Sequence, residues 1–186
     1  MRQLVRPFID SQFDIFPVVP FPDIYYASMT PYFRVSSLHA AFPGEQVPNT
    51  LSEVLSRHGK THLHIAETEK YAHTTFFFNG LNDQSFSGET DMLIDSEKQA
   101  SAHPRMRADE ITDKVIAEIE RDYYDVIILN YANADTLAHS GNLETTIKGV
   151  EAIDDNIGRL YKAVTAREGT LIITADHGHA ESMVYR

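Results

Sequence analysis

Two short apolar runs joined by a long stretch of helical spacing constrain the fold of this chain more than any other feature. The runs are DVIILN at 125–130 and TLIIT at 170–174, and uninterrupted apolar runs of this length are typical of strands buried in a parallel sheet. A strand, a helix and a strand in this order predict an α/β fold. Over 142–166 the apolar side chains recur every three or four residues, as on the buried face of a helix: Leu143, Ile147, Val150, Ile153, Ile157, Leu160 and Val164.

The same alternation extends towards the N-terminus. Residues 61–66 and 73–79 have the β-branched and aromatic content of strands. Residues 107–122 have the apolar spacing of an amphipathic helix. A shorter helix is expected between a cap at Asn49 and a stop at Gly59. Helices and strands therefore alternate over most of the chain.

The first forty-four residues differ from the rest because they are rich in proline and aromatic side chains and lack a helical period. Proline disrupts helices and central strands alike, so only 23–28 is expected to form a strand. We therefore expect an irregular arm over 1–44, followed by a domain over 45–186.

The net charge of −11 and the absence of cysteine narrow the possible functions. A strongly acidic chain is a poor partner for nucleic acid or an anionic membrane, although a bound divalent ion can reverse the local field for a phosphate substrate. Without cysteine, a metal site must use His, Asp and Glu. No apolar run approaches the about 18 residues of a membrane span, and the N-terminus lacks a signal-peptide pattern, so a cytoplasmic protein is expected.

Two clusters of acids and imidazoles follow the two apolar runs. Asp135 and His139 come soon after the first run, and Asp176 and His177 directly follow the second. Ligands of α/β sheets bind beyond the carboxyl ends of the strands, so these four side chains are candidates for a metal centre using Mn, Mg or Zn. Two ions would clamp the attacking and leaving oxygens of a phosphoryl transfer. The structural alternatives are a capping aspartate with a solvated histidine and an Asx turn.

A third cluster of charged side chains lies between the expected strands 61–66 and 73–79. Within it, Lys70 could act as a point charge for a phosphate, with Glu69 beside it. Surface loops carry such charges routinely, so the alternative is a solvated loop.

The three clusters together resemble the 2,3-bisphosphoglycerate-independent phosphoglycerate mutases of the alkaline phosphatase superfamily. The matching motifs are, in order, IAETEKYAHTTFFFNG, ILNYANADTLAHSG and ITADHGHAE, and the string AETEKYAH separates these mutases from phosphopentomutases and phosphatases. The resemblance implies a partial alkaline-phosphatase-like sheet with flanking helices. It also implies that 1–44 are the tail of a transferase domain with a linker, and that 45–186 are part of the phosphatase, or metal-binding, domain.

The resemblance further implies the interconversion of 2-phosphoglycerate and 3-phosphoglycerate in glycolysis through a phosphoserine. Such an enzyme is usually monomeric and uses two Mn²⁺ ions (or Mg²⁺, Zn²⁺ or Co²⁺) without bisphosphoglycerate. By the same resemblance, Asp135 and His139 are ligands of one ion. Asp176 and His177 are ligands of the other, and Lys70, with Glu69 beside it, holds the transferred phosphoryl group.

Several residues of the family pattern have no counterpart in this sequence. They are the nucleophilic serine, the arginines that grip the substrate, one aspartate ligand and one histidine ligand. We therefore expect a fragment of the enzyme that is inactive alone. Two other interpretations stay open: a non-catalytic binding domain, and another metal-dependent phosphatase of the same superfamily. His179 stands where the family usually has asparagine, which makes it a candidate additional imidazole near the second ion.

Overall fold

The computed structural model describes residues 2–19, 25–31 and 39–183. The chain divides into two compact units, Met1–Gln46 and Val47–Arg186. The described residues of the first unit form a helix and one parallel strand pair, namely α1 (Arg2–Ile9), β1 (Ala27–Ser28) and β2 (His39–Ala40).

The first unit corrects the expectation of an arm without helix. Helix α1 occupies most of its first ten residues. Of the strand expected over 23–28, only Ala27–Ser28 pairs, and residues 23–24 lie outside the described part of the chain.

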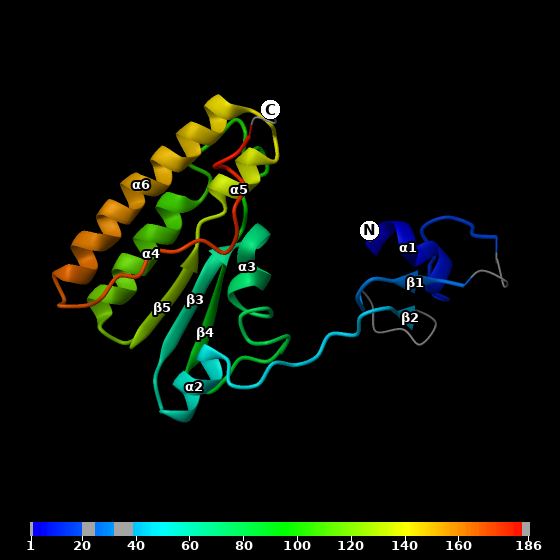
Figure 1. The fold of residues 1–186 in the computed structure, drawn as a ribbon, viewed down its shortest axis with the longest axis horizontal. Helices are drawn as coiled ribbons and strands as arrows, with labels where there is room; N and C mark the ends of the chain where they lie inside the picture. The colour runs from blue at the N-terminus through cyan, green and yellow to red at the C-terminus, as the bar shows by residue number, and fades with distance from the viewer. Residues whose placement is uncertain (1, 20–24, 32–38, 184–186) are drawn as a thin grey trace. The chain divides into compact units, whose positions relative to one another are not determined.

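A parallel three-stranded sheet forms the centre of the second unit (Figure 1). Its strands are β3 (His62–Glu67), β4 (Glu89–Ile94) and β5 (Val126–Asn130), in the order β4-β3-β5. All six residues of β3 are buried, because this strand is paired on both edges and covered on both faces. The sequence predicted β3 and β5 but not β4, because the mixture of charged and apolar residues in β4 gives no clear strand pattern.

Five helices complete the second unit, and the predicted α/β fold with a parallel sheet and flanking helices is confirmed. Ile65 of β3 packs with Ile111 and Leu160 in the main core, which places two long helices against one sheet face (Figure 1). Among the described residues, no helix is both long and apolar enough to cross a membrane. The helices are α2 (Leu51–Arg57), α3 (Thr68–Thr74), α4 (Ala108–Arg121), α5 (Asn133–Ala138) and α6 (Leu143–Thr165).

The cap of α2 is one residue later than the sequence predicted. Thr50 Oγ1 accepts the backbone N–H of Glu53 at 3.3 Å, which makes Thr50 the cap. Asn49 has a left-handed backbone with φ of 60°, and its own N–H donates to Glu53 Oε2 at 2.6 Å. The Thr50 and Glu53 side chains thus satisfy backbone donors that the helix itself leaves free.

The strand expected over 73–79 is wrong, because these residues end helix α3 and continue in tight turns. The N–H of Asn79 bonds to Thr75 O at 2.8 Å, and the N–H of Leu81 bonds to Phe76 O at 2.9 Å. These bonds are local, so the segment has its hydrogen-bonding groups satisfied without a neighbouring strand. The aromatic content indicated burial correctly for part of the segment, but not the type of structure.

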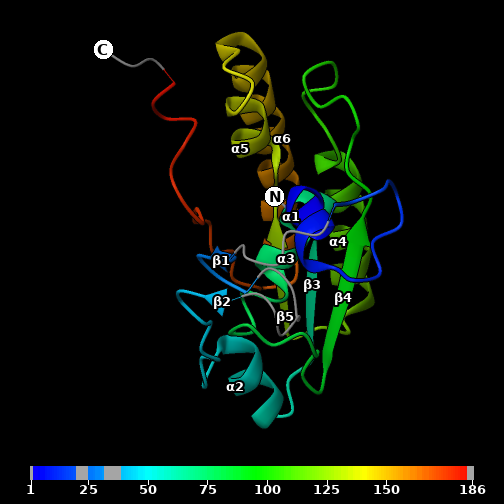
Figure 2. The same cartoon turned by 90° about the vertical axis from the view of Figure 1, so that its right-hand side faces the viewer.

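The strand expected over 170–174 is also absent from the structure. The segment follows α6 as irregular chain (Figures 1 and 2), and β5 pairs only with β3 in the described part of the protein. Ile172 is 83% exposed and Ile173 is 62% exposed. A strand forms only where a second strand accepts its hydrogen bonds, and here the apolar run has none.

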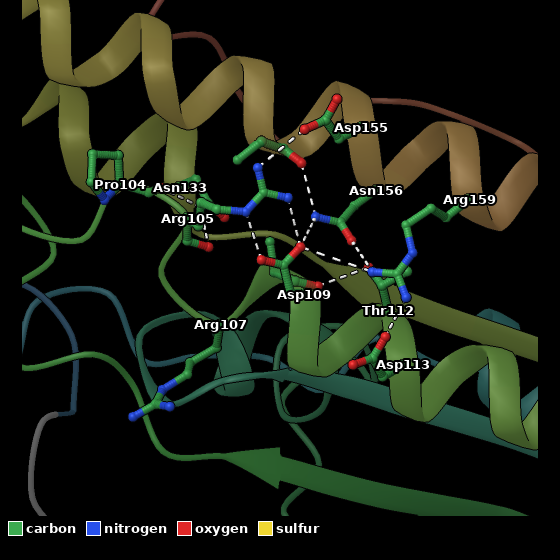
Figure 3. A network of polar contacts seen from close by, with 12 residues as sticks. Pro104, Arg105, Arg107, Asp109, Thr112, Asp113, Asn133, Asp155, Asn156 and Arg159 are labelled. Atoms are coloured by element: carbon green, nitrogen blue, oxygen red, sulfur yellow. Dashed lines mark hydrogen bonds and ion pairs between the residues drawn. The ribbon is translucent and has the colours of Figure 1, made fainter.

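A network of polar contacts fixes the start of α5 relative to α4 and α6 (Figure 3). Asn133 is fully buried, and its Nδ2 donates to Pro104 O at 2.8 Å and to Arg105 O at 2.9 Å. Arg105 in turn holds Asp109 of α4 with two bonds, of 2.6 and 2.7 Å, and Asp155 of α6 at 3.1 Å. These contacts position the first turn of α5, in which the candidate ligand Asp135 lies.

Candidate metal centre

The carboxyl ends of β3 and β5 each lead into a short helix that carries a candidate functional residue. Strand β3 runs directly into α3, with Lys70 in its first turn, and β5 leads into α5, with Asp135 in its first turn. Asp176 and His177 lie after α6, in chain that forms neither helix nor strand. Because the strands are parallel, the two helices begin at the same edge of the sheet, and α5 lies at the opposite end from α2 in both views (Figures 1 and 2).

The three segments meet at the ammonium group of Lys70. Its Nζ lies 2.8 Å from Asp135 Oδ2 and 3.4 Å from Asp176 Oδ2, and it donates to His177 Nε2 at 3.1 Å. An ammonium has no lone pair, so Nε2 accepts and the neutral ring carries its proton on Nδ1, which faces Gly178 O at 3.3 Å. Two carboxylate oxygens and one imidazole nitrogen, all of them atoms that bind divalent ions, therefore converge on a single cation.

The second carboxylate oxygen of Asp135 contacts two histidines. His179 Nδ1 lies 2.7 Å from Asp135 Oδ1, and His139 Nε2 lies 3.4 Å from the same oxygen. The two rings meet edge to face with their centroids 4.3 Å apart. Asp135 and His139 are four residues apart on one helical turn, so they face the same way. Ligand atoms of Asp135, His139 and His179 all lie within 4.8 Å of one another, a spacing that one metal ion can span.

The two aspartates remain ionised in this environment. Burial acts to raise the pKa of Asp135, but the hydrogen bonds from Lys70 and His179 outweigh it and hold the pKa at about 2. Burial likewise opposes the ionisation of Asp176, but the charge of Lys70 and its hydrogen bond lower the pKa of this carboxyl. Both groups therefore offer negatively charged oxygens at neutral pH, as hard divalent ions require.

Most of the side chains around Lys70, though not that of Asp176, line an open pocket of about 650 Å³. Lys70 is only 4% exposed, so its ammonium is held at the base of the group rather than free in solvent. Glu69 also lines the pocket, next to Lys70 along α3. The remaining lining residues are His73, Asp135, Thr136, His139, His177, Gly178 and His179. The volume and the mixture of charges suit a small anionic ligand bound with metal ions.

The structure brings together all the residues that the sequence selected and gives His179 a different neighbour. The sequence suggested His179 as an imidazole near the ion of Asp176, whereas its contact is with Asp135. Spacing along the chain could not show this, because Asp135 and His179 are 44 residues apart. The signal available was the residue type itself, since His179 is a second histidine within three residues of Asp176 and offered another nitrogen ligand.

A parallel sheet with aspartate, histidine and lysine gathered at its strand ends defines an α/β metalloenzyme. The chain belongs to the Metalloenzyme superfamily, whose family profile matches residues 22–185. This membership and the donor set of the pocket both point to the use of divalent metal ions.

The chain is similar to proteins named 2,3-bisphosphoglycerate-independent phosphoglycerate mutase. Those of Shewanella sp. strain W3-18-1 and of Shewanella oneidensis are each 46% identical to it over 98% of its length. A crystal structure of the phosphoglycerate mutase of Leishmania mexicana at low cobalt concentration superposes with a TM-score of 0.80 and 31% identity, covering 96% of this chain and 33% of that one. The chain spans about 36% of the length of the Shewanella relatives.

Proposed function

We propose that this chain is the metal-binding part of a 2,3-bisphosphoglycerate-independent phosphoglycerate mutase. The observation that carries the proposal is the convergence of Asp135 Oδ2, Asp176 Oδ2 and His177 Nε2 on the Lys70 ammonium. The names of the relatives add the reaction, which is the interconversion of 2-phosphoglycerate and 3-phosphoglycerate. The substrate is thus a small phosphorylated acid.

In this proposal Asp135 and His139 hold one divalent ion, and Asp176 and His177 hold the other, with Mn²⁺ as the ion expected. The bound ions would neutralise the charge that a transferring phosphoryl group spreads over its oxygens, and would activate a serine nucleophile. Lys70 would bind the phosphoryl oxygens as a point charge. Glu69, beside it on the pocket wall, would orient the substrate.

His179 would add a third donor to the ion held by Asp135 and His139. Its Nδ1 is already within 2.7 Å of Asp135 Oδ1, and its ligand atom lies within the same 4.8 Å group. The nucleophilic serine and the substrate arginines would come from the part of the relatives' length that this chain does not span. Residues 1–44 would belong to the transferase domain and its linker, and 45–186 to the phosphatase domain.

A chimera tests the proposal directly. These residues replace the matching 36% of the Shewanella oneidensis mutase, and the purified chimera is assayed with Mn²⁺ and 3-phosphoglycerate for formation of 2-phosphoglycerate. Conversion by the chimera, and its loss by at least about a hundredfold in D135N and D176N chimeras, is expected, because positioned charges of this kind contribute factors of about 100–1000 to rate. The isolated chain is expected to be inactive.

One control variant and two contradicting outcomes complete the test. Lys148→Met removes an exposed lysine of α6 that pairs only with a neighbouring turn of the same helix, and should leave the activity unchanged. A folded chimera that binds Mn²⁺ but hydrolyses 4-nitrophenyl phosphate without converting phosphoglycerate would favour a phosphatase of the same superfamily. A folded chimera that binds no divalent ion would favour a non-catalytic binding domain.

A further inference from the structure

Four side chains that can bind metal lie together on the sheet, separate from the pocket at Lys70. His62 and His64 are two residues apart on β3, and Glu89 and Asp91 are two residues apart on β4. The strand register places His62 beside Glu89 and His64 beside Asp91. Since side chains alternate between the two faces of a strand, all four project from the same face. They occupy the amino-terminal half of the strands, whereas the pocket lies beyond the carboxyl ends.

The donor atoms are spaced as the ligands of one small ion are spaced. His62 Nδ1 lies 3.0 Å from His64 Nε2, close to the about 3.3 Å that separates two nitrogens each bound at about 2.0 Å in a tetrahedral zinc site. Ligand atoms of His62, His64 and Glu89 all lie within 4.8 Å of one another. Asp91 is not one of these three, and its Oδ1 lies 3.9 Å from His64 Nδ1 beside the group.

Two buried polar atoms of the cluster have no hydrogen-bond partner among the described residues, and the histidine tautomer can be assigned from the others. His64 Nδ1 lies 2.6 Å from the Thr74 carbonyl oxygen, and since a carbonyl can only accept, Nδ1 carries the proton. In the neutral ring the lone pair is then on Nε2, where it accepts the N–H of His62 Nδ1. An N–H bonded to a carbonyl, as at Nδ1, is the usual support of a metal-bound histidine. Within the described residues, His62 Nε2 and Asp91 Oδ1 are buried without a hydrogen-bond partner.

The two carboxylates of the cluster carry negative charge that a bound cation would neutralise. The side chains of His64 and Glu89 are fully buried, and that of Asp91 is 17% exposed. In the part of the chain that the structure describes, His64 is the only ion-pair partner of these two carboxylates. Glu89 accepts hydrogen bonds from Asn79 Nδ2 and Phe86 N, and Asp91 accepts one from Ser85 Oγ. These donors are uncharged, so one divalent cation would neutralise both carboxylates.

We propose that His62, His64, Glu89 and Asp91 form a buried structural site for a divalent cation of the zinc class. Four protein ligands would close the coordination of the ion, which is typical of structural rather than catalytic zinc. Binding would need no net proton release, because the proton on His62 can move from Nδ1 to Nε2. The ion would join β3 to β4 across the sheet, and it would enter as the chain folds because both histidines are fully buried.

The test uses a background in which the pocket at Lys70 cannot retain metal. D135N/D176N protein is refolded with Zn²⁺, dialysed against metal-free buffer and analysed for zinc by mass spectrometry. The expected result is one zinc per chain, reduced at least tenfold when H64Q or E89Q is added. H103Q, which changes an exposed histidine, is the matched control and should retain the ion. Circular dichroism spectra establish which variants are folded.

X-ray absorption at the zinc edge of the D135N/D176N protein keeps the proposal testable if H64Q and E89Q do not fold. Two histidine nitrogens and carboxylate oxygens around the zinc are expected. Failure of the folded background protein to retain zinc would overturn the proposal. Retained zinc with fewer than two histidine ligands would overturn it as well.

Discussion

Lys70 Nζ and Asp135 Oδ2 form an ion pair of 2.8 Å at the meeting point of three chain segments. The Lys70 side chain is almost completely buried, whereas the Asp135 side chain is 20% exposed. The pair joins α3 to α5, and the same ammonium reaches Asp176 beyond α6. Lys70 is therefore the internal counter-charge of both candidate ligand carboxylates.

Replacing Lys70 by methionine should destabilise the protein in the absence of metal and much less in its presence. Removal of the ammonium leaves two carboxylates without their opposing charge, which should lower the free energy of unfolding by about 1–3 kcal/mol at such a partly buried site. Mn²⁺ should restore most of this loss by taking the same oxygens. Urea denaturation with and without Mn²⁺ measures both effects.

The matched control for that experiment is Lys148→Met on α6. Lys148 pairs with Glu144 at 2.8 Å on an exposed surface, where ion pairs contribute little. Its replacement should change neither the stability nor the response to Mn²⁺. An equal loss in K70M with and without Mn²⁺ would contradict the idea that lysine and metal neutralise the same oxygens.

Asn133→Ala should weaken metal binding without touching a ligand. The change removes two hydrogen bonds to the backbone of Pro104 and Arg105, at a loss of about 1–3 kcal/mol. The Arg105 carbonyl keeps the N–H of Ala108 at 3.1 Å as its partner, whereas the Pro104 carbonyl loses its Asn133 donor. Because Asp135 is two residues further along α5, its placement should loosen and Mn²⁺ affinity should fall several-fold by calorimetry. Asn142→Ala removes only the cap of α6, so it should lower stability by about 1 kcal/mol with unchanged Mn²⁺ affinity.

Replacement of two glycines of α6 by alanine should change the stability of the protein in opposite directions. A Cβ at Gly149 would collide with Leu137 Cδ1 of α5, and such overpacking should reduce stability by about 1–3 kcal/mol. Gly158 has nothing within 4 Å of the added carbon, so alanine there should stabilise the helix by up to about 1 kcal/mol. Thermal melts of both variants test the close packing of α5 on α6, and equal shifts would contradict it.

The free energy of unfolding of the Glu67→Gln variant, relative to that of the unchanged protein, should increase as the pH rises. Burial raises the pKa of Glu67 above its ordinary value of 4.5, and the N–H bond from Arg107 offsets this only in part. The protonated form therefore contributes stability below the unfolded-state pKa, and this is lost as the pH passes the folded-state pKa. Glutamine keeps the neutral form at every pH, so urea denaturation at about pH 4 and about pH 7 should show a relative gain for E67Q at the higher pH.

Glu144→Gln is the control, because its relative stability should change with pH in the opposite direction. The hydrogen bond and charge of Lys148 lower the pKa of Glu144, so its contribution is present above the unfolded-state pKa and is lost as the pH falls. The relative stability of E144Q should thus fall slightly, or stay level, between about pH 4 and about pH 7. The same upward trend in both variants would show that the E67Q effect does not come from the burial of Glu67.

The sequence by itself determined those elements whose signal is local. Apolar side chains at helical spacing fixed α4 and α6 to within one or two residues. A continuous apolar run fixed β5, and strand-type residue content fixed β3. The residue types after the expected strands selected Asp135 and Asp176, and a charged segment supplied Lys70. The structure brings the three together, although no strand precedes Asp176. These features depend on periodicity and on the direction of the chain, both of which can be read from the sequence.

Only the tertiary structure decided the features that depend on a partner far along the chain. The run at 170–174 is apolar enough for a strand but has no strand beside it, and 73–79 satisfies its backbone by local turns instead. Contact of His179 with Asp135, and the position of His62 beside Glu89, arise from segments that fold together. A hydrogen bond or a shared ion joins two groups in space, so its formation is decided by packing and not by the order of residues.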